Sequence, residues 1–138
     1  MSPFLWTVRV YWEDTDGGGV VYYANYLKFL DRARTEWLRS GGYSQAQLAV
    51  EPGVLFSVAE VQIKYLKPAR LDELLTVRST ATREGAASLV FKQSIHRHAT
   101  RGDVLTEATV RVVCVSAVKF RPQRLPASLA KMFTQEAQ

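Results

Sequence analysis

The sequence predicts an α+β fold in which one long helix packs on a five-stranded antiparallel sheet. Apolar residues recur at helical spacing over Asn25–Ser40, whereas five other stretches alternate with a period of two residues. The chain has 138 residues, so we expect a single domain spanning 1–138. A helix over these residues is about 24 Å long and too short to cover such a sheet. The sheet surface left exposed predicts association into a homodimer or homotetramer.

The first half of the predicted fold is a strand, a loop and the long helix. Phe4–Trp12 alternates and is rich in Val, Tyr and Trp, which favours a strand. Acidic residues and three consecutive glycines between positions 13 and 19 interrupt this pattern and predict a loop. The helix follows over Asn25–Ser40. Asn25 is a suitable N-cap residue, and Gly41 and Gly42 end the helical pattern.

A shorter helix and four strands complete the predicted order. Ser44, followed three residues later by Gln47, resembles a capping box that opens a short second helix. Gly85 and the Gly102–Asp103 pair predict the turns of an antiparallel meander. A terminal helical turn is expected at Ser128–Phe133. The four predicted strands are Val54–Tyr65, Leu74–Arg83, Ser88–Arg97 and Val104–Ser116.

Composition narrows the classes of function. The net charge of +5 favours an anionic partner. The Lys and Arg residues are scattered and no nucleic-acid-binding motif is visible, so we expect no nucleic-acid partner. Apolar runs such as Val112–Val115 are far shorter than a membrane span, and the first residues lack the pattern of a secretory signal. Cys114 is the only cysteine, which fits a reducing compartment. We therefore expect a cytoplasmic protein with no integral membrane segment.

The segment from Glu13 to Tyr23 carries the clearest chemical pattern. Glu13, Asp14 and Asp16 place three acids within four positions, and the glycines after them permit a sharp turn close to a ligand. A helix follows, and its unpaired amides favour negative charge. A carboxylate facing a helix N-terminus suits ester or thioester cleavage, because the amides hold the oxyanion while the carboxylate activates water or attacks. From these residues alone, a plain glycine-rich turn remains the alternative.

A resemblance to a known family extends well beyond this loop. The loop resembles the motif of the 4-hydroxybenzoyl-CoA thioesterase family at Thr15, Asp16, Gly19, Val20, Val21, Tyr23 and Tyr26. Further stretches are similar to the Tol-Pal-associated acyl-CoA thioesterases and keep the same order: Arg32–Glu36, Tyr65 with Pro68–Asp72, Ser88–Phe91, and Val112–Val115. The resemblance covers Val8 to Leu129. It implies a hot-dog fold, a sheet wrapped around one long helix, in dimers or tetramers whose active sites lie at the dimer interface.

The resemblance also implies an activity and its residues. The implied reaction is hydrolysis of acyl-coenzyme A to a free acid and coenzyme A, without a metal or cofactor. The family's catalytic aspartate matches Asp16, as general base or as nucleophile. The amide that polarises the thioester carbonyl matches the backbone amide of Tyr23. Relatives often carry His or Phe at this position, but the amide is retained whatever the side chain.

Two other functions stay open at this point. One is a hot-dog hydratase or dehydratase acting on carrier-bound acyl chains, which generally needs a catalytic His that this loop lacks. The other is an adaptor in envelope maintenance or lipid synthesis that binds acyl carrier protein.

Ser88, Lys67 and Arg70 are candidate substrate contacts. By the resemblance, Ser88 opens a strand that lines the thioester cleft, where it would contact the pantetheine arm. Lys67 and Arg70, together with Lys64, would meet the phosphates of coenzyme A. A solvated surface explains these three cations equally well.

The remaining chemically active residues are expected to be structural or solvent-facing. Glu13 and Asp14 are predicted to be solvent-exposed loop acids. His96 and His98 lie two apart on one face of a strand, a spacing that permits metal binding, but no third ligand stands at a suitable spacing. Cys114 lies among valines in a predicted core strand and is expected to be a buried, inert thiol.

Overall fold

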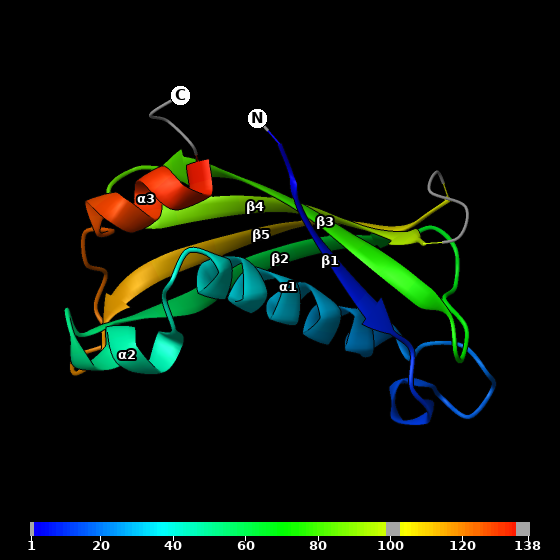
Figure 1. Cartoon of the computed structure of the whole chain (residues 1–138). Coiled ribbons are helices and arrows are strands. Elements are labelled where there is room, and N and C mark those ends of the chain that lie inside the picture. The colour runs from blue at the N-terminus through cyan, green and yellow to red at the C-terminus, as the bar shows by residue number, and fades with distance from the viewer. Residues whose placement is uncertain (1, 99–102, 135–138) are drawn as a thin grey trace.

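The computed structural model describes residues 2–98 and 103–134, which form one antiparallel sheet curved around a long helix (Figure 1). The helices are α1 (Tyr26–Ser40), α2 (Gln45–Val50) and α3 (Ala127–Thr134), and 3-10 turns occur at Trp12–Asp14 and Tyr23–Asn25. The strands are β1 (Phe4–Arg9), β2 (Val54–Tyr65), β3 (Leu74–Glu84), β4 (Ser88–Arg97) and β5 (Val104–Ser116).

The strands lie in the order β1-β3-β4-β5-β2, and every neighbouring pair is antiparallel. The predicted meander of β3, β4 and β5 is therefore confirmed. Gly85 lies in the β3–β4 turn with a φ of 72°, a conformation that glycine adopts without strain. Gly102, from the other predicted turn, lies outside the described residues. The first and second strands of the chain occupy the two edges of the sheet.

Most predicted boundaries agree with the structure. The bounds of β2, β4 and β5 are those predicted, and β3 is one residue longer. The short helix α2 begins after Ser44, whose hydroxyl accepts a hydrogen bond from the Gln47 amide at 3.2 Å. The expected helical turn near the end is part of α3. The first strand is shorter than predicted, because the chain leaves the sheet at Arg9 and enters a 3-10 turn at Trp12.

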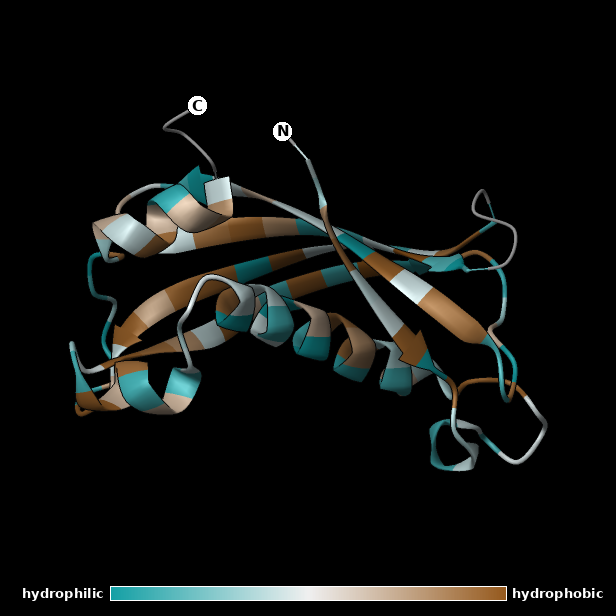
Figure 2. Ribbon diagram, in the orientation of Figure 1, coloured by the Kyte–Doolittle hydropathy of each residue, from teal (hydrophilic) through white to brown (hydrophobic). Residues whose placement is uncertain are grey.

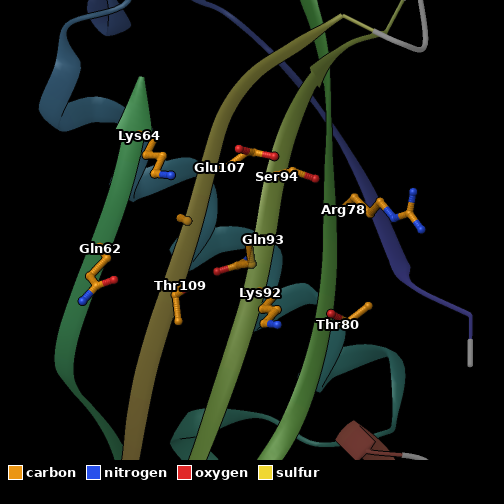
Figure 3. A pocket seen from close by; sticks show the side chains of 10 residues that line it. Gln62, Lys64, Arg78, Thr80, Lys92, Gln93, Ser94, Glu107 and Thr109 are labelled. Carbon is orange, nitrogen blue, oxygen red and sulfur yellow. The ribbon is translucent and has the colours of Figure 1, made fainter. Parts of the chain in front are cut away.

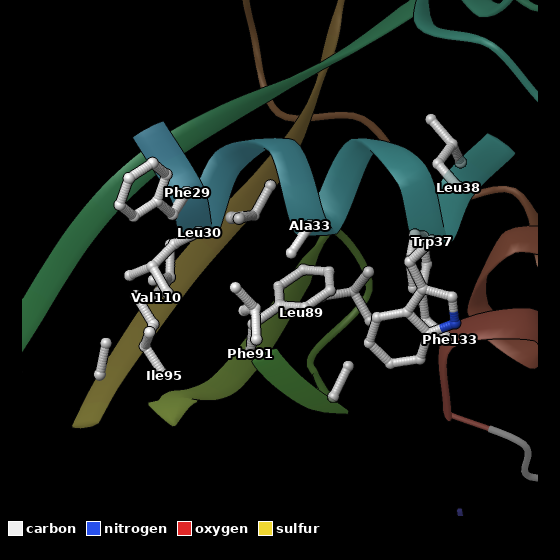
Figure 4. Packing of buried hydrophobic residues seen from close by; sticks show 14 of the residues in the cluster. Phe29, Leu30, Ala33, Trp37, Leu38, Leu89, Phe91, Ile95, Val110 and Phe133 are labelled. Carbon is white, nitrogen blue, oxygen red and sulfur yellow. The ribbon is translucent and has the colours of Figure 1, made fainter. Parts of the chain in front are cut away.

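The core lies between the apolar face of α1 and the inner face of the sheet. Hydrophobic and hydrophilic residues alternate along the strands and around α1 (Figure 2). Leu30 on the helix lies beside Val110 and Ile95, and Ala33 and Trp37 face Leu89 and Phe91 of β4 (Figure 4). This packing, more than helix propensity, holds α1 on the sheet.

One buried polar group also fixes α1 on the sheet. The Gln93 side chain donates to the Leu30 carbonyl at 3.1 Å and to the Ser79 hydroxyl at 2.9 Å. Its oxygen accepts a hydrogen bond from Arg34 at 2.9 Å. Burial of the guanidinium lowers the pKa of Arg34. Since each buried polar atom here is paired, the network holds the helix in one register without a desolvation penalty from an unmade bond.

Candidate active site

The acidic loop begins with a tight turn instead of an extended strand. Val10 is still bonded to the segment just before β3, since its amide donates to the Glu73 carbonyl at 2.9 Å. The Tyr11 amide then donates to Asp14 Oδ2 at 2.8 Å, and the Asp14 amide donates to the Tyr11 carbonyl at 3.0 Å. These two bonds close the turn. The alternating pattern of residues 10–12 therefore predicted a strand where a side-chain hydrogen bond stabilises a turn.

Asp14 and Glu13 lie in different environments, so the expectation for Asp14 was wrong. Glu13 is exposed, as predicted. Asp14 is only 6% exposed and accepts a hydrogen bond from the Asn25 side chain at 2.8 Å in addition to the one from Tyr11. A buried carboxylate with two donors is stabilised by them, whereas without them its burial would be costly.

The glycine-rich part of the loop is folded onto a second segment of chain. The Asp16 amide donates to the Val20 carbonyl at 3.0 Å, which closes the loop on itself. The Val21 amide donates to the Ala69 carbonyl at 2.8 Å, and the Leu71 amide donates to the Gly19 carbonyl at 3.0 Å. Gly19 has a φ of 86°, which favours glycine. Backbone hydrogen bonds to residues 69–71 thus hold the loop in place.

The Asp16 side chain is exposed on this loop, and one of its two carboxylate oxygens accepts a hydrogen bond. Its Oδ1 accepts a hydrogen bond from the Gly18 amide at 2.7 Å. The other oxygen has no partner within residues 2–98 and 103–134. A side chain at position 18 would place its Cβ 3.1 Å from Oδ1, so glycine there leaves room for the carboxylate. The loop therefore orients the carboxylate through the Gly18 amide.

Tyr23 lies at the start of the 3-10 turn that runs directly into α1. Amides in the first turn of such a helix have no intrahelical partner, and the helix dipole makes this end partly positive. Asn25 does not cap the helix with its side chain, contrary to the prediction, because that side chain is turned toward Asp14. The Tyr23 amide, at the start of this segment, can therefore donate a hydrogen bond to a carbonyl oxygen or an oxyanion.

Aromatic rings surround this helix start. A hollow of about 260 Å³ is lined by Val21, Tyr23, Tyr26, Tyr65, Leu66, Lys67 and Pro68. The Tyr65 hydroxyl donates to the Tyr23 carbonyl at 3.0 Å, and its ring lies 5.5 Å from that of Tyr26. Burial raises the pKa of both Tyr26 and Tyr65, so both are neutral phenols near neutral pH. The hollow presents apolar ring faces beside the Tyr23 backbone.

The cations predicted for phosphate binding have different partners. Lys67 lines the aromatic hollow, but its ammonium pairs with Asp103 Oδ1 at 2.6 Å. Hydrogen bonds from Lys67 and Arg97 lower the pKa of Asp103. Arg70 is exposed, and its backbone forms a bridge with Val20, so it lies directly beside the acidic loop.

Ser88 is not brought to Asp16 within one chain. It is buried at the first position of β4, opposite Val113, and Arg111 donates to its hydroxyl at 3.4 Å. The loop lies at the other end of the sheet, where Arg97 at the end of β4 pairs with Glu73. Ser88 therefore remains a predicted contact that a single chain does not complete.

Neither the histidines nor the cysteine lines the hollow beside Tyr23. His96 and His98 each share a hydrogen bond with a neighbouring hydroxyl, those of Ser94 and Thr76, both at 2.7 Å. Within the described residues, no three His, Cys, Asp or Glu side chains form a group that would hold a metal. Cys114 is fully buried, as predicted, and burial raises the pKa of its thiol.

A larger hollow than the one beside Tyr23 lies away from Asp16. It has a volume of about 510 Å³ and lies on the face of the sheet opposite α1, where polar side chains of β2 to β5 line it (Figure 3). Lys64, Arg78 and Lys92 surround a single acid, Glu107. It contains no carboxylate beside a helix N-terminus, so size alone does not identify the reactive site.

Comparison with known proteins assigns the family. The model of the thioesterase superfamily matches residues 18–103, and the chain belongs to this superfamily. The acyl-CoA thioester hydrolase YbgC of Escherichia coli O6:H1 is 46% identical over 132 residues, which cover 96% of each chain. The acyl-CoA thioesterase YbgC of Haemophilus influenzae is 41% identical over 96% of this chain and 95% of that protein.

Solved structures agree with this assignment. The 1,4-dihydroxy-2-naphthoyl-CoA thioesterase Slr0204 from Synechocystis superposes with a TM-score of 0.88 at 25% identity and 99% coverage of both chains. A probable thioesterase from Bartonella henselae has a TM-score of 0.84 at 34% identity, covering 91% of this chain and all of that one. The predicted hot-dog fold is confirmed. None of the helices in residues 2–98 and 103–134 has the length and hydrophobicity that a membrane span requires.

Proposed function

We propose that this protein hydrolyses the thioester bond of an acyl-coenzyme A, with Asp16 as the catalytic carboxylate. The observation that carries the proposal is the loop itself. It holds an exposed carboxylate with one free oxygen and leads, seven residues later, into the amides that open α1. The names of the YbgC relatives, which match this chain over nearly its whole length, support the choice of acyl-coenzyme A as substrate.

The proposed chemistry needs two groups. The Tyr23 amide donates to the thioester carbonyl oxygen and holds the oxyanion as negative charge develops on it. Asp16 removes a proton from the attacking water, or attacks the carbonyl carbon and forms an anhydride that water then opens. On both routes the tetrahedral adduct expels coenzyme A as a thiolate: the first route gives the free acid directly, and the second gives the anhydride that water then opens. Because thiols have a pKa of about 8.5, this leaving group needs less protonation than an alkoxide or an amine.

We also propose that the site is completed by a second copy of the chain. β2 is an edge strand with exposed apolar side chains at Val58, Val61 and Tyr65, and unpaired edges of this kind favour pairing with another strand. Antiparallel pairing of two β2 edges brings the Tyr65 end of one copy toward the Val54 end of the other. Ser88 lies near that second end, because it pairs with Val113, which in turn pairs with Ser57.

This geometry supports the proposed substrate contacts. Ser88 of the second copy would lie across from the Tyr23 end of the first, within reach of a pantetheine arm. Arg70, exposed beside the loop, and Lys67 at the aromatic hollow would meet the phosphates of coenzyme A. Lys67 would do so at the expense of its pair with Asp103, so we expect Arg70 to contribute more.

The dimer is directly testable. We expect light scattering at micromolar concentration to give at least twice the 15.5 kDa of one chain. Val61→Lys should shift the protein toward the monomer, because a charge on an edge strand opposes pairing. Val118→Lys, at an exposed position outside the strands, is the matched control and should leave the mass unchanged. A stable and active monomer of the unmodified chain would contradict the proposal.

Acyl carrier protein is a second partner that the surface favours. Lys64, Arg78 and Lys92 have no ion-pair partner within the described residues, and only Glu107 offsets them in their hollow. An acidic carrier would complement this charge.

We place the protein in the cytoplasm, which the free, buried thiol of Cys114 supports.

The function is tested by following free thiol from a panel of thioesters. The panel contains acyl-coenzyme A of increasing chain length, an aromatic acyl-coenzyme A, an acyl carrier protein thioester and an enoyl thioester. We expect coenzyme A to be released from at least one acyl-coenzyme A at a rate far above that in buffer. Hydration of the enoyl thioester without thiol release would instead identify a hydratase. Binding of the carrier protein with no turnover on any substrate would favour the adaptor.

A further inference from the structure

Asp14 and Asn25 form a buried pair at the two ends of the reactive loop. Each side chain is only 6% exposed, and Asn25 Nδ2 donates to Asp14 Oδ1 at 2.8 Å. The two residues are eleven positions apart, and the chain between them carries both Asp16 and Tyr23. Nothing in the sequence pattern joins them, because neither lies on a periodic apolar face.

Both residues are also tied to the backbone on each side of the loop. Asp14 Oδ2 accepts from the Tyr11 amide, and the Asp14 carbonyl accepts from the Tyr22 amide at 2.9 Å. The Asn25 amide donates to the Tyr22 carbonyl at 2.8 Å. The pair therefore joins the turn that precedes Asp16 to the residue that precedes Tyr23.

Such a connection matters because the loop between these ends is rich in glycine. Gly17 and Gly19 have φ of 90° and 86°, and glycine segments lose more conformational freedom on ordering than any others. Fixing the two ends limits how far the Asp16 carboxylate and the Tyr23 amide can move apart. In a hydrolysis that needs both at one carbonyl, a displacement of about 1 Å costs as much as 10²-fold in rate.

We propose that the Asp14–Asn25 pair positions the two reacting groups of the proposed thioesterase, setting the separation between the Asp16 carboxylate and the Tyr23 amide. Neither residue of the pair touches the substrate. The inference rests on the proposed function, and it assigns to Asp14 a role different from that of its neighbour Asp16. Asn25 serves this pair in place of the side-chain cap of α1 that it does not form.

The pair allows a test by exchange of its two members. Asn25→Asp places two carboxylates against each other, which breaks the hydrogen bond through repulsion. Combining it with Asp14→Asn restores a carboxylate and an amide in swapped places. In this double variant, residue 14 still offers an oxygen to the Tyr11 amide and a donor to residue 25. Lys28→Gln lowers the net charge by the same amount at an exposed position on the first turns of α1 and is the matched control.

We expect Asn25→Asp to lower kcat by about 10- to 100-fold with little change in KM. The double variant should recover to within a few-fold of the parent, and Lys28→Gln should match the parent. The kcat of each variant is calculated on the concentration of folded protein, which urea unfolding gives. Asn25→Ala, which removes the donor without adding charge, provides the same measurement if Asn25→Asp does not fold.

Two outcomes would overturn the inference. One is a folded Asn25→Asp or Asn25→Ala variant with the kcat of the parent. The other is a folded double variant that stays as slow as the single one, which would mean that the loss in rate comes from the changed side chain at position 25 and not from the broken hydrogen bond. Failure of the proposed function is distinguishable from both, because the parent protein itself would then release no thiol.

Discussion

Asp16→Asn is expected to reduce kcat for thioester hydrolysis by about 10²- to 10⁴-fold, the range for loss of a general base. This corresponds to roughly 3 to 5 kcal/mol of activation free energy, and a nucleophilic role would make the loss larger. Asparagine keeps the size of the side chain and its acceptor oxygen for the Gly18 amide. It neither takes a proton from water effectively nor attacks a carbonyl. Binding of coenzyme A and the thermal melting temperature should stay close to those of the parent.

The control for this variant follows from the burial of the neighbouring acids. Glu13→Gln removes the same charge three residues away at an exposed position and should leave kcat close to that of the parent. Asp14→Asn is unsuitable as a control, since Asp14 is buried and hydrogen-bonded at the base of the loop. An equal loss in Asp16→Asn and Glu13→Gln would mean that the net charge of the loop, and not one carboxylate, determines the rate.

Phe91→Ala is expected to lower the free energy of unfolding by about 3–5 kcal/mol, the range for loss of a buried phenylalanine ring. Phe91 is 3% exposed and packs edge-on against Trp37 and Phe133, at centroid distances of 5.8 and 5.3 Å (Figure 4). The Arg34 guanidinium lies 6.0 Å from its ring centroid. Removing the ring leaves a cavity at the place where α1, β4 and α3 meet.

Urea unfolding at one fixed protein concentration measures this change, because the proposed oligomerisation would make apparent stability depend on concentration. Phe120→Ala is the matched control: it makes the same truncation at a side chain that is 68% exposed, and we expect a change within about 0.5 kcal/mol. A loss below about 1 kcal/mol for Phe91→Ala would mean that this part of the core relaxes around the cavity.

The strands and the main helix could be predicted from the sequence because their signal is local and repeated. The period-two alternation of β2, β4 and β5 fixed their bounds to the residue, and turn residues such as Gly85 indicated the meander. The apolar spacing of α1 likewise identified its buried face. These are cases where local preference and tertiary packing agree.

The end of β1 could not be predicted in the same way. Tyr11 and Trp12 continue the alternating pattern, but the Asp14 carboxylate binds the Tyr11 amide and turns the chain. That hydrogen bond depends on burial of Asp14, and its burial depends in turn on Asn25, eleven residues later. A hydrogen bond between two polar side chains far apart in the sequence produces no periodic pattern. The sequence therefore predicted wrongly that Asp14 is exposed to solvent.

The candidate site was identified from the sequence only in part. The acids, the glycines and the following helix indicated a carboxylate beside a helix start. The structure shows the Asp16 carboxylate bonded to the Gly18 amide and Tyr23 at the first position of the turn that leads into α1. The aromatic hollow formed by Tyr23, Tyr26 and Tyr65 was not expected, because Tyr65 comes from a strand remote in sequence. The proposed role of Ser88 depends on a second copy of the chain, which no local pattern describes.

The rate of thioester cleavage in a single turnover is the measurement that tests the central claim most directly. Enzyme in excess is mixed with an acyl-coenzyme A that the parent hydrolyses, the reaction is stopped at intervals, and the remaining thioester is measured by mass spectrometry. This isolates thioester cleavage from product release. We predict that Asp16→Asn binds the thioester but cleaves it at least about 100-fold more slowly than the parent. Cleavage of the bound thioester at the parent rate would contradict the account and place the catalytic group elsewhere.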